Sequence, residues 1–215
     1  MKLTLKPQPR NKPNAFTLIE MIGVLAIIAI LAAVLIPKVF NAINNARVNN
    51  AAMSCQTVKT ALIDHYAKYG VLATEFGTNS LTLPYNSFDQ ILLEEQFLDK
   101  PLATKISTNA FVELRNIGTG GDALKIGGTV DATVATGFAL AGYETNNVVG
   151  STEAIAVLQG VTGNDARDLS ERIDGDAASG MTQTDPTLLD ADGRVKYAAP
   201  DTSGLTTVYI YLTHR

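Results

Sequence analysis

The sequence predicts an α+β protein in which one long amino-terminal α-helix packs against a carboxy-terminal antiparallel β-sheet head. Three observations support this prediction. Residues 16–36 form an apolar run of 21 residues, long enough for a membrane-spanning helix. Helical periodicity then continues to Tyr69, and segments with strand-like alternation follow Gly70.

The apolar run contains one ionisable residue, Glu20. At ~1.5 Å per residue, a helix over residues 16–36 is about as long as the hydrocarbon core of a bilayer is thick. An isolated carboxylate there costs at least ~2.5 kcal/mol on insertion scales, so we expect a partner from outside the segment. Alternatively, Glu20 is only an acid at the start of the helix, where the macrodipole favours a negative charge by ~0.3–1 kcal/mol.

The residues before the run set its orientation. Residues 1–15 contain four Lys or Arg and no acid, whereas only Lys38 and Arg47 follow within fifteen residues of the run. This asymmetry predicts a cytoplasmic amino terminus with the rest of the chain outside. A secretory signal peptide would have a shorter apolar core and a small-residue cleavage site. Ala32-Ala33 is a poor match to that site, because the run continues smoothly into Val39-Phe40.

With its basic leader, the sequence Ala15-Phe16-Thr17-Leu18-Ile19-Glu20 resembles the amino terminus of type IV pilin and type II secretion pseudopilin precursors. The resemblance covers roughly residues 10–45. It implies that prepilin peptidase cleaves between Ala15 and Phe16 and methylates the new Phe16 amine. It also implies that Glu20 meets the Phe16 amine of a neighbouring subunit. The family usually has Gly before the cut, where this chain has Ala15.

The chain therefore divides into a cleaved basic leader (1–15), a transmembrane and filament-core helix (16–36), an amphipathic continuation of that helix (37–69) and an α+β head (70–215). Pro37 lacks an amide hydrogen and should kink or locally melt the helix. Gly70 should end it. The apolar positions of the helix after residue 35 recur at steps near 3.6: Ile36, Phe40, Ile43, Ala51, Val58, Leu62 and Tyr69.

Within the head, Ser87-Phe88-Asp89-Gln90 has the pattern of a capping box before a short helix that ends ahead of Pro101. A helix over Ala154–Leu158 is predicted with Ser151 as its cap, and another over Ala166–Ile173 with Asn164 as its cap. The predicted strands are 111–117, 123–126, 129–135, 137–142 and 205–212.

The charge and cysteine content of the chain bear on which ligands and cross-links are expected. Removing the four leader bases leaves 13 Lys and Arg against 21 Asp and Glu, a net charge of −8, which argues against a nucleic-acid surface. Cys55, the single cysteine, cannot form an internal disulfide. It is predicted to be a small buried residue, with intermolecular pairing as the minor alternative.

Neither a metal centre nor catalysis is strongly indicated. Asp190 and Asp192 have the spacing that opens a calcium loop, but no downstream Glu completes it. An ordinary turn is therefore preferred, no cofactor is expected, and calcium remains the alternative. His65 and His214 have no acid or Cys placed in the sequence to make either a general base, so the chain is not predicted to be an enzyme.

These observations favour a structural subunit of a type IV pilus or pseudopilus, anchored in the inner membrane and later part of a periplasmic or cell-surface filament. Its implied partners are copies of itself and related pilins, prepilin peptidase and the inner-membrane assembly platform. The alternative is a signal-anchored extracytoplasmic ligand-binding protein tethered by an uncleaved helix, and an anchored enzyme ranks third.

Overall fold

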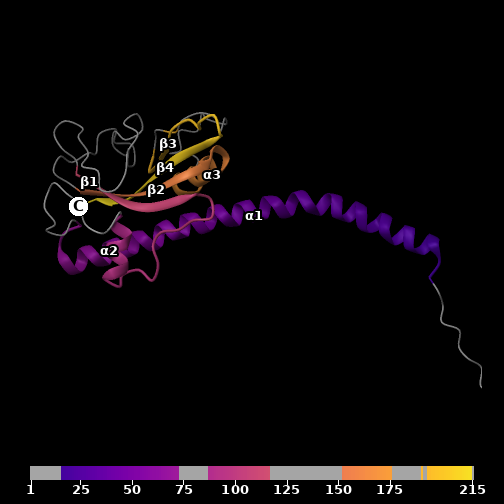
Figure 1. Cartoon of the computed structure of the whole chain (residues 1–215), viewed down its shortest axis with the longest axis horizontal. Helices are drawn as coiled ribbons and strands as arrows, with labels where there is room; N and C mark the ends of the chain where they lie inside the picture. Colours follow the sequence, from indigo (N-terminus) through magenta and orange to yellow (C-terminus); the bar gives the residue numbers. More distant parts are fainter. Residues whose placement is uncertain (1–15, 73–86, 117–151, 176–189, 191–192, 215) are drawn as a thin grey trace, which may run out of the picture. The chain divides into compact units, whose positions relative to one another are not determined.

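The computed structural model describes residues 16–72, 87–116, 152–175, 190 and 193–214 (Figure 1). The chain separates into two units, Met1–Ile43 and Asn44–Arg215.

Helix α1 runs from Leu18 to Tyr69 as one α-helix, as the sequence predicted. It stays helical through Pro37, so the local melting expected there does not occur. At its end, Gly70 adopts a φ of +75° and donates its amide to the Tyr66 carbonyl at 2.7 Å. A glycine in this left-handed conformation commonly closes a helix, so the predicted stop is confirmed.

The second unit contains a four-stranded antiparallel sheet in the order β1-β2-β4-β3 (Figure 1). Its strands are β1 (Asn109–Asn116), β2 (Thr152–Thr162), β3 (Val195–Tyr197) and β4 (Leu205–His214). The strands predicted at 111–117 and 205–212 are confirmed as β1 and β4. Those predicted at 123–126, 129–135 and 137–142 lie outside the described residues.

The helix predicted over Ala154–Leu158 is wrong, because these residues lie within β2. All five are at most 2% exposed. β2 pairs with β1 on one side and with β4 on the other, and a central strand buried on both faces has a continuous apolar run instead of alternation. The predicted cap, Ser151, lies outside the described residues.

The two short helices also correct the predicted caps. Helix α2 covers Phe88–Glu94, and Ser87 at its N-cap makes no side-chain capping hydrogen bond, so the predicted capping box is wrong. Helix α3 covers Gly163–Asp174, which confirms the helix predicted over 166–173. Its cap is Thr162 instead of Asn164: Thr162 has extended backbone, and its Oγ1 accepts a hydrogen bond from the Asp165 amide at 3.3 Å.

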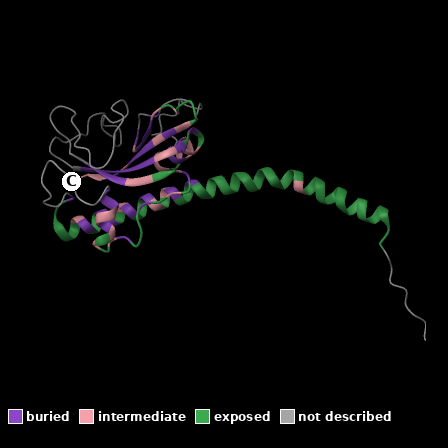
Figure 2. Cartoon of the chain, viewed as in Figure 1, coloured by how far each residue is buried: buried purple, intermediate pink, exposed green. Residues whose placement is uncertain are grey.

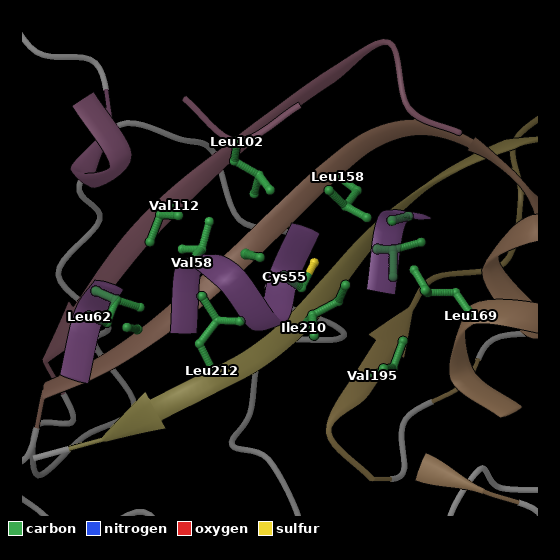
Figure 3. Close-up of a cluster of buried hydrophobic side chains, with 14 of the residues drawn as sticks. Cys55, Val58, Leu62, Leu102, Val112, Leu158, Leu169, Val195, Ile210 and Leu212 are labelled. Atoms are coloured by element: carbon green, nitrogen blue, oxygen red, sulfur yellow. The ribbon is translucent and has the colours of Figure 1, made fainter. Parts of the chain in front are cut away.

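The main core of the second unit lies between α1 and one face of the sheet, with α3 alongside (Figures 2 and 3). The residues that α1 contributes to this core begin at Val48. Four of the apolar positions predicted on this part of the helix are exposed instead: Ile36, Phe40, Ile43 and Tyr69. Cys55 is 2% exposed, which confirms its predicted burial. The core side chains labelled in Figure 3 come from α1, the sheet, α3 and the segment before β1: Cys55, Val58, Leu62, Leu102, Val112, Leu158, Leu169, Val195, Ile210 and Leu212.

Alternate strand positions form a second cluster on the opposite face of the sheet. Ile155, Val157 and Tyr209 are each at most 5% exposed and belong to this cluster. Successive side chains of a strand point to opposite faces, so the same strands β2 and β4 supply both clusters.

Candidate functional site

The start of α1 is closed by reciprocal hydrogen bonds between Thr17 and Glu20. Glu20 Oε2 accepts from the Thr17 amide at 2.8 Å and from the Thr17 hydroxyl at 2.7 Å. In return, Thr17 Oγ1 accepts from the Glu20 amide at 3.3 Å. This is a capping box, and it satisfies amides that have no partner inside the helix. Sequence analysis missed it, although Thr17-Leu18-Ile19-Glu20 has the required spacing.

The Glu20 carboxylate has no basic partner among the residues that the structure describes. Glu20 Oε2 receives both hydrogen bonds from Thr17, and no salt bridge involving Glu20 is present in the described chain. Two neutral donors stabilise a carboxylate without cancelling its charge. In a hydrocarbon environment, Glu20 would therefore still be stabilised by a cation.

The residues that follow Glu20 form an exposed apolar surface. Leu25 is 60% exposed and Ile30 is 67% exposed, and all other residues of 16–43 are also exposed except Ala32, which is half-buried (Figure 2). Among the described helices, α1 is the one long and apolar enough to cross a membrane. A helix that is apolar on every side suits lipid or a protein core and not water.

The predicted cleavage site is described on one side only. Phe16 immediately precedes the capping box in non-helical backbone and is 82% exposed. Ala15 lies outside the described residues. The structure thus places Phe16 and Glu20 at the same end of α1, separated by the Thr17 cap.

The candidate calcium residues lie elsewhere, in the second unit. Asp190 is 6% exposed and its Oδ2 accepts from the Ser170 hydroxyl at 2.7 Å, while its backbone pairs with Tyr197. Burial, followed by the charge of Asp190, raises the pKa of Tyr197 to about 12. Asp192 lies outside the described residues, which contain no group of three or more His, Cys, Asp or Glu arranged for a metal. A calcium role for the pair stays a prediction.

The structure places an acid beside His65 that the sequence did not indicate. His65 Nδ1 is 2.6 Å from Glu95 Oε2, and the ring contacts Tyr69, Phe88 and Phe97. His65 is 0% exposed, so the pair is part of the packing and not open to a substrate. His214 contacts Tyr211 through its Nδ1. A contact across 30 residues leaves no local signal in the sequence.

Comparison with known families assigns the amino-terminal segment to a class. Residues 10–36 match the model of the prokaryotic N-terminal methylation motif, which is the signature of type IV pilins and pseudopilins. The resemblance seen in the sequence is therefore confirmed for this segment, and with the apolar helix it fits a membrane-anchored, prepilin-type precursor. No curated protein and no solved structure matches the chain.

Proposed function

We propose that this chain is the precursor of a filament subunit, a type IV pilin or pseudopilin, which is anchored in the inner membrane, processed by prepilin peptidase and assembled into a helical filament. The observation that carries the proposal is the lone Glu20 carboxylate at the start of an exposed apolar helix, inside the matched methylation motif.

Processing would change the charge at the start of α1 without removing the capping box. Cleavage between Ala15 and Phe16 removes four basic residues and leaves a new amine on Phe16. Thr17 remains in the mature chain, so its hydroxyl and amide can still bond to Glu20. The mature terminus would then contain one cation and one anion within a single turn.

Assembly would use this charge pair between subunits. The Thr17 donors are neutral, so a Phe16 amine from a neighbouring subunit supplies the positive charge that Glu20 lacks inside the apolar run. Because each subunit contributes one amine and one carboxylate at fixed positions, the contact would set the axial register between adjacent helices. Peptidase and assembly platform would be the remaining partners.

Mass spectrometry of the mature amino terminus tests the processing step. The expected terminus of the native protein is N-methylated Phe16, and Ala15→Gly should be processed at least as completely. A bulky residue in Ala15→Leu should block cleavage. If the native chain keeps Met1, the helix is an uncleaved tether and the alternative of an anchored ligand-binding protein gains.

Two substitutions at one position separate assembly from capping. Gln also completes a capping box, so Glu20→Gln keeps the helix start and removes the charge. Glu20→Ala removes both. We expect both variants to enter the membrane at least as well as the wild type, since a costly acid is gone, and both to lose filament assembly. Membrane fractionation and imaging of sheared filaments give the two readouts.

The Glu20→Gln variant is the decisive one. Filaments at the wild-type level would show that the charge of Glu20 has no role in assembly and that the residue is a helix cap alone. Filaments lost in Glu20→Ala but kept in Glu20→Gln would assign the defect to the missing cap.

A further inference from the structure

The sulfur-containing side chains of Met53 and Cys55 lie in opposite environments, although only one residue separates them on α1. Met53 is 68% exposed, more than any other large hydrophobic residue described in the second unit. Cys55 is 2% exposed and lies in the core (Figure 3). Two residues turn an α-helix by about 200°, so the two side chains leave α1 on nearly opposite sides.

The core protects Cys55 chemically as well as sterically. Oxidants attack the thiolate of a cysteine, and burial raises the pKa of the Cys55 thiol to about 12. At neutral pH the thiol therefore stays protonated and shielded from solvent. A thioether has no proton to lose, so the reactivity of Met53 toward an oxidant follows from its access to solvent.

The face of α1 around Met53 is uncharged. The Thr57 hydroxyl donates to the Met53 carbonyl at 3.1 Å, and the Thr60 hydroxyl donates to the Gln56 carbonyl at 3.1 Å. These hydroxyls bond to the backbone of their own helix and leave the Met53 thioether open to water. The exposed residues of α1 between positions 49 and 63 are Asn49, Asn50, Met53, Gln56, Thr57, Thr60 and Ile63.

We propose that Met53 is a site of reversible oxidation, which peroxide converts to methionine sulfoxide while the fold and the Cys55 thiol stay intact. A lone pair of the Met53 sulfur takes one oxygen atom from the peroxide, the O–O bond breaks and water is released. The sulfur is oxidised by two electrons and the peroxide is reduced by two. A methionine sulfoxide reductase reverses the step, because two thiols are oxidised to a disulfide and the oxygen leaves as water.

The surface position of Met53 explains why the fold would tolerate the product. A sulfoxide is polar, and a hydrophobic core would be disrupted by it. Asn50 and Gln56 lie three residues away on either side of Met53, so their carboxamide groups can donate to the sulfoxide oxygen on the same face. We therefore expect the melting temperature to change by less than about 2 °C on oxidation of Met53. The inference depends neither on membrane insertion nor on filament assembly.

The test exposes the full chain in detergent micelles to hydrogen peroxide, with and without urea, and follows each sulfur-containing peptide by mass spectrometry. Met53 in the native chain should react at a rate within about tenfold of its rate in the unfolded chain, because it is already exposed. Cys55 should react more than about tenfold more slowly in the native chain than in the unfolded one. A methionine sulfoxide reductase supplied with thiol should then remove the oxygen from folded Met53.

A matched variant separates exposure from residue type. Leu62 lies on the same helix and is 0% exposed, and exchange of Leu for Met conserves volume. In Leu62→Met the new thioether should react more slowly than Met53 in the native chain and at a similar rate in urea. The wild-type comparison between native and unfolded chain stands even if this variant fails to fold.

Three results would overturn the proposal. The first is a native Met53 that reacts more than about tenfold more slowly than in urea, which would show that it is covered. The second is oxidation of Cys55 at the same rate as Met53 in the native chain. The third is a Met53 sulfoxide that the reductase cannot reduce in the folded chain, or that lowers the melting temperature by more than about 2 °C.

Discussion

The buried carboxylate of Asp89 accepts a hydrogen bond from the backbone amide of Val112, with 3.1 Å between Oδ1 and the amide nitrogen. Its other oxygen, Oδ2, accepts from the Leu102 amide at 3.0 Å. Asp89 is 2% exposed. A single side chain in the first turn of α2 thus bonds to strand β1 and to the segment before it. A buried carboxylate is tolerated where it is hydrogen-bonded in this way.

Asp89→Ala should destabilise the second unit, because it leaves two buried amides without their acceptor. Each unsatisfied buried group costs about 1–3 kcal/mol, so we expect a loss of a few kcal/mol in the free energy of unfolding. Asp89→Asn keeps one acceptor oxygen, so its free energy of unfolding should fall between those of the wild type and Asp89→Ala. Asp99→Ala, at an exposed acid nearby, is the control. Urea denaturation that ranks Asp89→Ala with Asp99→Ala would contradict this role.

The His65–Glu95 pair gives a second prediction about stability. Glu95→Ala should cost about 1–3 kcal/mol, because it removes the partner of a histidine that is 0% exposed. His65→Leu should cost less, since the Glu95 side chain is 21% exposed and can be hydrated. A double-mutant cycle measures the coupling directly. Additive effects of the two substitutions would show that the contact contributes no coupling energy, and Glu94→Ala controls for loss of an adjacent acid.

A third prediction concerns the loss of stability when a Cβ is added at Gly160, which lies close to Thr108. Gly160 has a φ of +69° and lies at an irregularity in β2, where an added Cβ would come 2.4 Å from Thr108 Oγ1. Gly175 has a similar φ of +73° but nothing within 4 Å of an added Cβ. Gly175 has a ψ of 173°, so Gly175→Ala should cost only the backbone strain, about 1–3 kcal/mol, whereas Gly160→Ala should add the clash with Thr108. Combining Gly160→Ala with Thr108→Ala should recover part of the difference, and equal melting temperatures for the two single variants would contradict the clash.

Stability should fall at alkaline pH because of Cys55 and Tyr197. Burial raises the pKa of the Cys55 thiol to about 12, and burial with the Asp190 charge raises that of Tyr197 to about 12. In the unfolded chain these groups titrate near ~8.5 and ~10. Between those values and 12 the unfolded state binds fewer protons than the native state. The free energy of unfolding should therefore decrease with rising pH, by up to ~1.4 kcal/mol per pH unit for each group.

Denaturation at a series of pH values checks this effect. Tyr197→Phe keeps the ring and removes the ionisable hydroxyl, so its stability should decline less steeply above pH ~10. Cys55→Ala should do the same from pH ~8.5, from a lower starting stability because of the smaller side chain. Unchanged slopes in both variants would assign the alkaline loss to other groups.

Local patterns in the sequence predicted some elements well and others poorly. The long helix and its stop at Gly70 were predictable, since both depend on residues adjacent in the chain. The capping box predicted at Ser87 is absent, whereas Thr17 and Glu20, for which no capping box was predicted, form one at the start of α1. The motif is necessary for a capping box, but the backbone before the helix decides whether the side chains meet.

Contacts between distant residues could not be predicted in this way. Residues 154–158 have helix-forming side chains such as Ala and Leu, and their strand conformation depends on pairing with β1 and β4 on either side. His65 and Glu95 meet only because α1 and the end of α2 pack together. The same holds for the hydrogen bonds from Arg47 to the Lys105 carbonyl and from Arg172 to Asn49, which join residues far apart in the sequence. By contrast, the processing segment is a contiguous motif, so a single sequence identified it.

Strand β4 lies between β2 and β3, although it comes last among the described strands along the chain. A chain that leaves the ribosome amino terminus first therefore presents α1 and β2 before residues 205–214 are made. Until then β3 has no partner among the described strands, and the Ile210 and Leu212 side of the core is missing. Anchoring by α1 would thus precede folding of the sheet in time, and a nascent chain interrupted before residue 205 would be held at the membrane with its core still open.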